Sequence, residues 1–141
     1  MQPETSSTVE APAHVLAMMV AAHGRVDERE LRALDALEAF RQLGVGRQRF
    51  VDIAQACVRD LGTGLCERSW LSTEEIHYVD ALLDAVPDPR QRLLVCRLGA
   101  AAFIADGGVT DDERLVYDHV CAHWRIRSDD LPPAMPLEQN P

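Results

Sequence analysis

Apolar side chains recur every three to four residues along most of the chain, which is the period of an α-helix. Within one such stripe, Leu31, Leu34 and Leu37 are expected to face the core. The pattern predicts helices over residues 13–23, 27–44 or 27–46, 47–61, 72–86, 90–106 and 110–126. No segment shows a convincing alternation of apolar and polar residues, which would be typical of a half-buried β-strand. We therefore expect an all-α fold, a single-domain bundle of six to seven helices.

The predicted bundle lies between two ends of different composition. Residues 1–12 are polar and are expected to form a flexible N-terminal tail, with Pro12 at the first position of the first helix. Residues 128–141 are rich in proline, which makes a helical continuation unfavourable. The helical domain is accordingly predicted to span residues 13–127. Within it, residues 90–106 are apolar on almost every side, which is typical of a buried central helix.

An acidic turn in the second half of the chain has an imperfect copy in the first half. Residues 105–113 read Ala-Asp-Gly-Gly-Val-Thr-Asp-Asp-Glu, and residues 22–30 read Ala-His-Gly-Arg-Val-Asp-Glu-Arg-Glu. In each copy a glycine ends one helix, and a capping residue with Glu three positions later begins the next. The copies align without a gap, so the pattern predicts a duplicated helix–turn–helix.

The acidic turn at residues 106–113 admits two interpretations. Its four carboxylates are the hard oxygen ligands that Ca²⁺ or Mg²⁺ prefers, although their spacing excludes an EF-hand. Helix capping accounts for Asp111, Asp112 and Glu113 without a cation. Asp106 is harder to explain, because a negative charge at a helix C-terminus costs about 0.3–1 kcal/mol. Either local backbone N–H groups or a cation would offset that cost, and capping is the simpler explanation.

Histidines form the second set of candidate metal ligands. His23 replaces Asp106 in the first copy, where it suits a helix C-terminus when charged and is able to ligate a metal when neutral. A surface cap is the simpler interpretation of His23. His119 and His123 lie four residues apart on one helix face, which is a zinc-binding spacing. The H-E-x-x-H signature and C-x-x-C pairs are absent. Two solvated histidines are the simpler interpretation, and a metal-dependent enzyme that uses Asp106 with this pair is the alternative.

Composition and charge limit the partners of the chain. The 141 residues carry a formal net charge of −9, and 14 Lys and Arg residues are scattered among 23 acids. This distribution disfavours nucleic acid and anionic membranes, whereas cations and basic protein surfaces are compatible. The longest apolar runs hold eight residues, and a membrane span needs about 20, so any membrane association is expected to be peripheral and through a partner. The four cysteines form no C-x-x-C pair, which favours a reduced, cytoplasmic protein.

Motifs for nucleophilic catalysis and nucleotide binding are missing. The sequence contains no G-x-S-x-G, no P-loop and no G-x-G-x-x-G, so we expect a non-enzymatic protein. Two groups of arginines are either solvated or able to receive an acidic peptide. These groups are Arg41, Arg47 and Arg49 around one loop, and Arg90, Arg92 and Arg97 along one helix.

The chain resembles the tellurite-resistance TerB family and its relatives, which include a domain fused to some J-domain co-chaperones. Residues 103–113 and their degenerate copy at residues 21–30 carry the resemblance, since the family shows A-D-G-x-[IV]-x-x-x-E at a helix–turn–helix, often twice. The resemblance covers about residues 13–127. It implies an all-helical, non-enzymatic domain linked to tellurite and metal stress, phage and colicin resistance, and membrane-associated assemblies.

The resemblance also implies a divalent-cation site on the motif acids. Carried over to this sequence, that site would use Asp106, Glu113 and Glu30, and His23 departs from the family's Asp. We therefore expect a cytoplasmic stress-response or adaptor module that binds a protein partner and a divalent cation, with Ca²⁺ or Mg²⁺ ahead of Zn²⁺. A metal-dependent enzyme and a purely structural interaction bundle stay open as alternatives.

Overall fold

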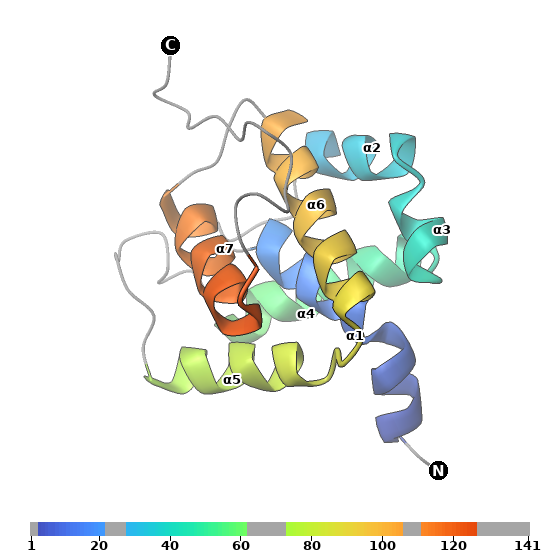
Figure 1. The fold of residues 1–141 in the computed structure, drawn as a ribbon. Helices are drawn as coiled ribbons and strands as arrows, with labels where there is room; N and C mark the ends of the chain where they lie inside the picture. The colour runs from blue at the N-terminus through green and yellow to red at the C-terminus, as the bar shows by residue number, and fades with distance from the viewer. Residues whose placement is uncertain (1–2, 22–27, 62–72, 106–110, 127–141) are drawn as a thin grey trace.

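The computed structural model describes residues 3–21, 28–61, 73–105 and 111–126, which form seven helices and no strand (Figure 1). The helices are α1 (Pro3–Val20), α2 (Glu28–Ala36), α3 (Ala39–Leu43), α4 (Arg47–Leu61), α5 (Thr73–Asp84), α6 (Pro89–Ala105) and α7 (Asp111–Trp124). The predicted all-α, single-domain bundle is thus confirmed for the described residues. The bounds of α4 agree with the prediction, and those of α5, α6 and α7 agree to within two residues.

Helix α1 forms the centre of the bundle. From Ala11 to Ala21, only His14 is not buried. The helix packs against α3, α4, α5, α6 and α7, so its apolar surface is covered from several sides. The prediction that residues 90–106 form the central helix is wrong, because α6 exposes Arg97 and Ile104. At the contact between α1 and α6 the helices approach closely, since a Cβ on Gly99 would lie only 2.9 Å from Cε of Met19.

The predicted N-terminal tail is wrong from Pro3 onward. Helix α1 begins at Pro3, and Pro12 lies inside it. Proline is favourable at a first helical position, whereas an internal proline removes one backbone hydrogen bond. Tertiary contacts offset that loss. Ala11 is buried, and Arg49 of α4 donates two hydrogen bonds to Glu10, with N–O distances of 2.9 and 2.8 Å. The first turns of α1 extend beyond the other helices toward the N-terminus (Figure 1).

The single helix predicted between Asp27 and Gly44 is divided into α2 and α3. Glu38 adopts a left-handed conformation (φ 57°), which breaks the helix and leaves Leu37 44% exposed instead of facing the core. The break allows the ring of Phe40 to pack on Phe50 of α4, with centroids 5.1 Å apart. The contact between Phe40 and Phe50 is therefore formed in place of the continuous buried leucine stripe that the sequence predicts.

Two helices end in the same hydrogen-bonded turn. Gly44 (φ 73°) follows α3, its N–H donates to Arg41 O, and the next N–H donates to Phe40 O. This is a Schellman motif, in which glycine is favoured because it adopts positive φ without strain. Helix α7 ends with the same pair of hydrogen bonds, but Arg125 (φ 58°) occupies the glycine position.

The duplicated helix–turn–helix corresponds to α1–α2 and α6–α7. The turns themselves, residues 22–27 and 106–110, lie outside the described residues. The helices that flank them pack directly on one another, since α6 contacts both α1 and α2, and α7 contacts α1. The two copies therefore form one core rather than two separate units.

We predict that Phe103→Ala lowers the free energy of unfolding by about 3–5 kcal/mol. Phe103 is fully buried, and its ring lies edge-on to Tyr117 with centroids 5.9 Å apart. The adjacent Ile104 is 38% exposed, so Ile104→Ala serves as the control and should cost about 1 kcal/mol or less. Urea unfolding followed by circular dichroism measures both values. Similar losses for the two variants would contradict this orientation of α6.

The Glu10–Arg49 pair should make the wild type more sensitive to acid than Glu10→Gln. Hydrogen bonds from Arg49 lower the pKa of Glu10 below its ordinary 4.5, against an opposing effect of burial. A carboxyl with a lowered pKa in the folded state stabilises the fold above the unfolded pKa, and this contribution is lost as the pH falls below about 4.5. The urea concentration at the midpoint of unfolding should thus fall less from neutral to acidic pH in Glu10→Gln than in the wild type. The control is Glu74→Gln, at an exposed position of α5, which should behave as the wild type does.

Candidate metal centre between α5 and α7

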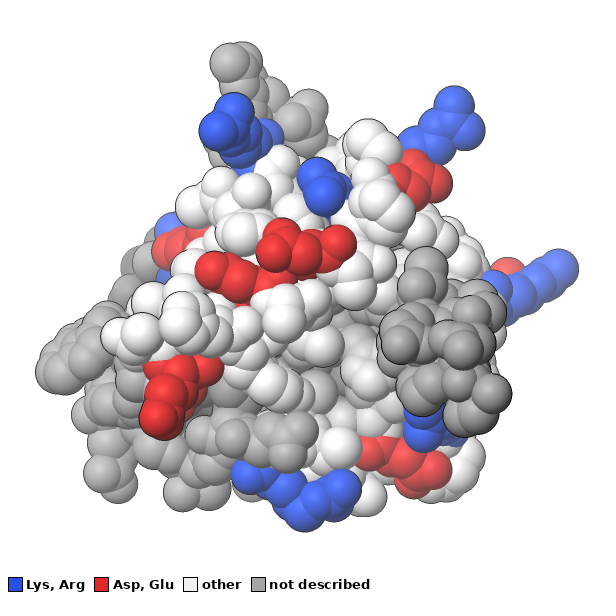
Figure 2. Space-filling model, turned by 90° about the horizontal axis from the view of Figure 1, so that it is seen from below, with Lys and Arg blue, Asp and Glu red and all other residues white. Residues whose placement is uncertain are grey.

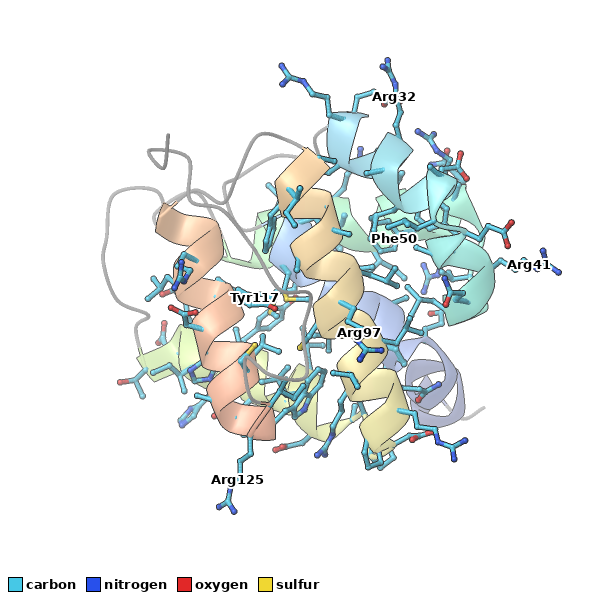
Figure 3. All side chains as sticks on the ribbon, turned by 45° about the horizontal axis from the view of Figure 1, so that its top comes forward. Arg32, Arg41, Phe50, Arg97, Tyr117 and Arg125 are labelled. Atoms are coloured by element: carbon cyan, nitrogen blue, oxygen red, sulfur yellow. The ribbon has the colours of Figure 1, made fainter. Side chains whose placement is uncertain are left out.

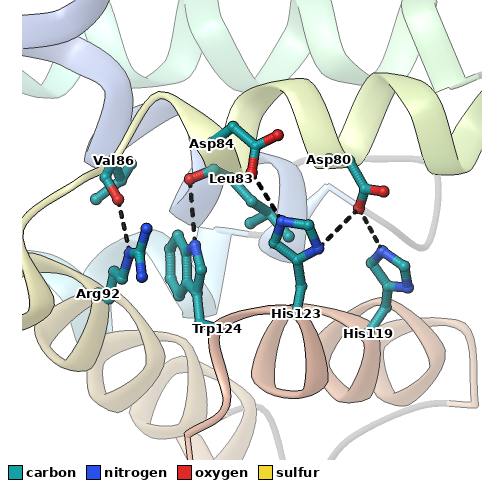
Figure 4. A network of polar contacts seen from close by, with 8 residues as sticks. All are labelled: Asp80, Leu83, Asp84, Val86, Arg92, His119, His123 and Trp124. Carbon is teal, nitrogen blue, oxygen red and sulfur yellow. Dashed lines mark hydrogen bonds and ion pairs between the residues drawn. The ribbon is translucent and has the colours of Figure 1, made fainter.

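Two pairs of metal-ligating side chains face each other where α5 packs against α7. Asp80 and Asp84 lie one turn apart on α5, and His119 and His123 lie one turn apart on α7. Residues four apart share a helix face, so each helix presents its pair together. Figure 4 shows the aspartates directed toward the imidazole rings, which are nearly parallel (interplanar angle 22°) with centroids 6.1 Å apart.

The packing of the core sets the register of these pairs. On α5, Val79 and Leu83 are buried, and each is followed by an aspartate. On α7, Val120 and Trp124 are buried, and each is preceded by a histidine. Because successive helical residues are rotated by about 100°, these polar side chains lie at the edges of the buried stripes. They meet at the rim of the interface between the helices.

The distances define an inner group of three residues and one outer carboxylate. Nε2 of His119 lies 2.7 Å from Oδ1 of Asp80, and Nδ1 of His123 lies 3.4 Å from the same oxygen. Nε2 of His123 lies 2.8 Å from Oδ1 of Asp84. The inner side chains are partly shielded, with exposed fractions of 25% for His119, 29% for His123 and 30% for Asp80, whereas Asp84 is 70% exposed.

The inner group has the spacing of a set of metal ligands. One donor atom each from Asp80, His119 and His123 lies within 4.8 Å of the other two, and small adjustments would bring all three to the bond lengths of about 2.0–2.2 Å that zinc requires. A hydrogen bond from Nε2 of His123 to Asp84 leaves Nδ1 of the neutral ring unprotonated. Carboxylates that fix the tautomer of a ligating histidine in this way are a recurrent feature of zinc sites.

The chemistry of the donors indicates which ions fit. Two imidazole nitrogens and one carboxylate oxygen suit Zn²⁺, Cu²⁺ or Ni²⁺, whereas Ca²⁺ and Mg²⁺ prefer oxygen ligands throughout. Three protein ligands leave one position of a tetrahedron open for water or another donor. The partial exposure of the group gives an ion access from solvent.

Neighbouring contacts hold the ends of both helices beside the site. The indole Nε1 of Trp124 donates to Leu83 O at 3.2 Å, which joins the end of α7 to α5. Nε of Arg92 donates to Val86 O at 2.7 Å, and the guanidinium lies over the indole ring, 5.6 Å from its centroid. These contacts, drawn in Figure 4, tie α5, α6 and α7 together at one corner of the bundle.

Cys96 of α6 and Cys121 of α7 form a pair of thiols, in which hydrogen bonds with Cys96 and Tyr117 lower the pKa of Cys121 against an opposing effect of burial. Cys96 is buried, and its hydrogen bond with Cys121, together with burial, raises the pKa of its thiol well above the ordinary range. It is therefore protonated at neutral pH, when it is neither a nucleophile nor a metal ligand.

The structure brings together one predicted pair of ligands, whereas most of the other candidates lie outside the described residues. His119 and His123 form the centre of the site, and both rings contact carboxylates while their side chains stay partly exposed, so solvent is not their only partner. Asp106 and His23 lie outside the described residues. Glu113 belongs to the first turn of α7, and its side chain lies outside the described part of the chain. A site on the acidic turns stays a prediction.

Glu30, the remaining predicted ligand, lies in a different environment. Its side chain is fully buried, and α2 packs against α6 and α3 rather than forming part of the α5–α7 interface. Burial of a carboxylate is costly unless it is paired or protonated. Among the described residues, the group with metal-ligand spacing does not include Glu30.

Sequence analysis missed Asp80 and Asp84. Their spacing on a predicted amphipathic helix matches that of His119 and His123, and this correspondence was the available signal. It is a weak signal, because periodicity shows which residues share a face of one helix but not which two helices are neighbours.

Comparisons with protein-family models, with curated proteins and with solved structures found no match. In the ranges that the structure describes, no helix combines the length and the apolar character needed to cross a membrane.

On the side covered by α5, acidic side chains occur in separate groups and arginines lie mainly toward the edges (Figure 2).

We predict that His119 and Asp80 are energetically coupled even without a metal. A double-mutant cycle of His119→Ala and Asp80→Ala, measured by urea unfolding in chelator, should give an interaction energy of about 0.5 kcal/mol or more, because the two groups are in contact. The control cycle combines His119→Ala with Glu38→Ala, which lies between α2 and α3, and should be additive. Additivity in both cycles would mean that the pair is not formed in solution.

Proposed function

We propose that this chain is a non-enzymatic, TerB-like adaptor module that binds a divalent transition metal, foremost Zn²⁺, between α5 and α7. The observation that carries the proposal is the convergence of Asp80, His119 and His123, whose donor atoms lie within 4.8 Å of one another. The resemblance to a family linked to metal stress agrees with this function. A site in a protein of net charge −9 also has a favourable field for cations.

The ligand set favours zinc over the calcium or magnesium expected from the acidic turn. Imidazole nitrogens are good ligands for zinc, and Asp84 supplies the orienting hydrogen bond to His123. The acidic turn remains a separate candidate for hard cations. The two proposals are distinguishable, because they involve different residues and different ions.

The geometry supports binding better than hydrolysis. In a zinc hydrolase, a general base must reach the metal-bound water. Asp84, the further carboxylate at the site, is hydrogen-bonded to His123 and is 70% exposed. It therefore orients a ligand rather than activating water. The open coordination position suits a donor group from a protein partner, which is what an adaptor requires.

Zinc should raise the melting temperature of the chelator-stripped full chain, whereas Ca²⁺ and Mg²⁺ should not do so through this site. An ion in hundredfold excess over its dissociation constant stabilises the fold by about 2.7 kcal/mol. His119→Ala, His123→Ala and Asp80→Ala should each abolish the shift. The matched control is His77→Ala, which removes an exposed histidine of α5. This variant should show the same zinc-dependent rise in melting temperature as the wild type.

Other outcomes would assign the metal elsewhere. A zinc shift that survives His119→Ala would contradict the site between α5 and α7. A shift with Ca²⁺ alone, removed by Asp106→Asn, would favour the acidic turn. Zinc-dependent ester hydrolysis that Asp84→Asn abolishes would favour the enzyme alternative.

A further inference from the structure

A second concave site lies at the corner where α5 ends, α6 begins and α7 ends. It has a volume of about 280 Å³ and is lined by Pro89, Arg92, Leu93, Trp124, Arg125 and Ile126. Four of these residues are apolar or aromatic, and two carry a guanidinium group. Sites for cofactors and drug-sized ligands typically measure about 300–1,000 Å³. The cavity is therefore suited to one large side chain with a polar neighbour rather than to a whole cofactor.

Arg92 is held in a fixed position within this cavity. Its Nε is occupied by the hydrogen bond to Val86 O, and the indole of Trp124 supports the plane of its guanidinium. Nε is only one of the three nitrogens, and within residues 3–21, 28–61, 73–105 and 111–126 no hydrogen bond involves the terminal N–H groups, which are left to bind an acceptor. An arginine fixed in this way loses little side-chain entropy when it binds a ligand.

Arg125 occupies a position where an arginine is unfavourable for the fold. It is the residue with positive φ in the Schellman motif that ends α7, a place that glycine fills at the end of α3. A side chain in the left-handed region is strained, and here it is also exposed. Figure 3 shows Arg125 extending from the end of α7. Arg125 also lines the cavity, so its exposed side chain can bring a second positive charge to the rim.

These two arginines differ from those around the loop before α4. There, Arg41 pairs with Glu38, Arg47 with Glu28 and Arg49 with Glu10, at distances of 3.2, 3.1 and 2.8 Å. Within the described part of the chain, no carboxylate forms an ion pair with Arg92 or Arg125. Among the described residues, the cavity thus combines an apolar floor with two arginines that have no ion-pair partner.

We propose that this cavity docks an acidic segment of a protein partner, in which a Glu or Asp carboxylate lies next to a large apolar side chain. The carboxylate accepts hydrogen bonds from the arginines, whose planar guanidinium groups match its geometry. The apolar side chain packs on Trp124, Leu93 and Pro89. This docking site is independent of the metal proposed between α5 and α7.

The surroundings favour a carboxylate over a phosphate. Asp88 caps the start of α6 through a hydrogen bond from the N–H of Arg90, and Asp84 lies at the end of α5. With these acids nearby and a net charge of −9, a phosphate of nearly two negative charges is repelled more strongly than a single carboxylate. Nucleic acid is disfavoured for the same reason.

The test uses the full chain and fluorescein-labelled hexapeptides with a central Glu-Leu, Glu-Phe, Asp-Leu or Asp-Phe, flanked by Ser and Gly. Fluorescence anisotropy at low and moderate salt measures their affinity. At least one peptide should bind, and its Gln or Asn counterpart should bind at least about tenfold more weakly, as expected for the loss of a hydrogen bond to a charged group. A phosphoserine-Leu peptide should bind no more tightly than the Glu peptide.

Arg125→Gly provides the decisive variant, because glycine is the preferred residue at that backbone position. It should weaken peptide binding about tenfold, while its melting temperature stays equal to that of the wild type or rises. Loss of binding then cannot result from unfolding. Arg90→Gln removes a neighbouring arginine of α6 that does not line the cavity, and it should leave the affinity unchanged.

Several results would overturn the proposal. One is that no acidic peptide binds. Another is that Arg125→Gly and Arg90→Gln lower the peptide affinity equally. A third is that the phosphoserine-Leu peptide binds more tightly than the Glu peptide. A further one is self-association of the wild type in sedimentation that Arg125→Gly abolishes, since a second copy of the chain would then occupy the cavity.

Discussion

The burial of α1 from Ala11 to Val20, where only His14 is not buried, is the constraint on which the rest of the structure depends. A helix that is apolar on all sides is stable only if neighbouring elements cover every face. Five other helices pack against α1, and close approach at Gly99 brings α6 into contact with it. Each covering helix must turn its own apolar stripe inward, so the position of α1 determines which side of these five helices faces solvent.

This constraint also builds the candidate metal centre. Helices α5 and α7 both pack on α1 and on each other, and their buried stripes fix their rotation. With that rotation, Asp80 and His119 border the same edge of the interface and approach to 2.7 Å. The ligand set is thus held by core packing, which makes it preorganised: binding an ion needs little rearrangement of the backbone.

The same corner of the bundle contains both proposed sites. Trp124 is next to His123 in sequence, and its indole both joins α7 to α5 and supports Arg92 in the neighbouring cavity. Figure 4 shows the imidazole and carboxylate groups on one side of this tryptophan and the guanidinium of Arg92 on the other. In the proposed adaptor, a cation site and a peptide site on the same rigid elements would present both ligands in a fixed relation.

The sequence by itself determined the all-α class, because helical periodicity and capping are local properties of neighbouring residues. It located α4 correctly and identified His119 and His123 as a pair on one face. Only the tertiary structure decided that α1 extends past Pro12, that Glu38 breaks a helix, and that Asp80 meets the histidines. The physical reason is that each of these depends on contacts between segments far apart in the chain. Such contacts stabilise a proline inside a helix or a residue at positive φ, and they select which helix faces which.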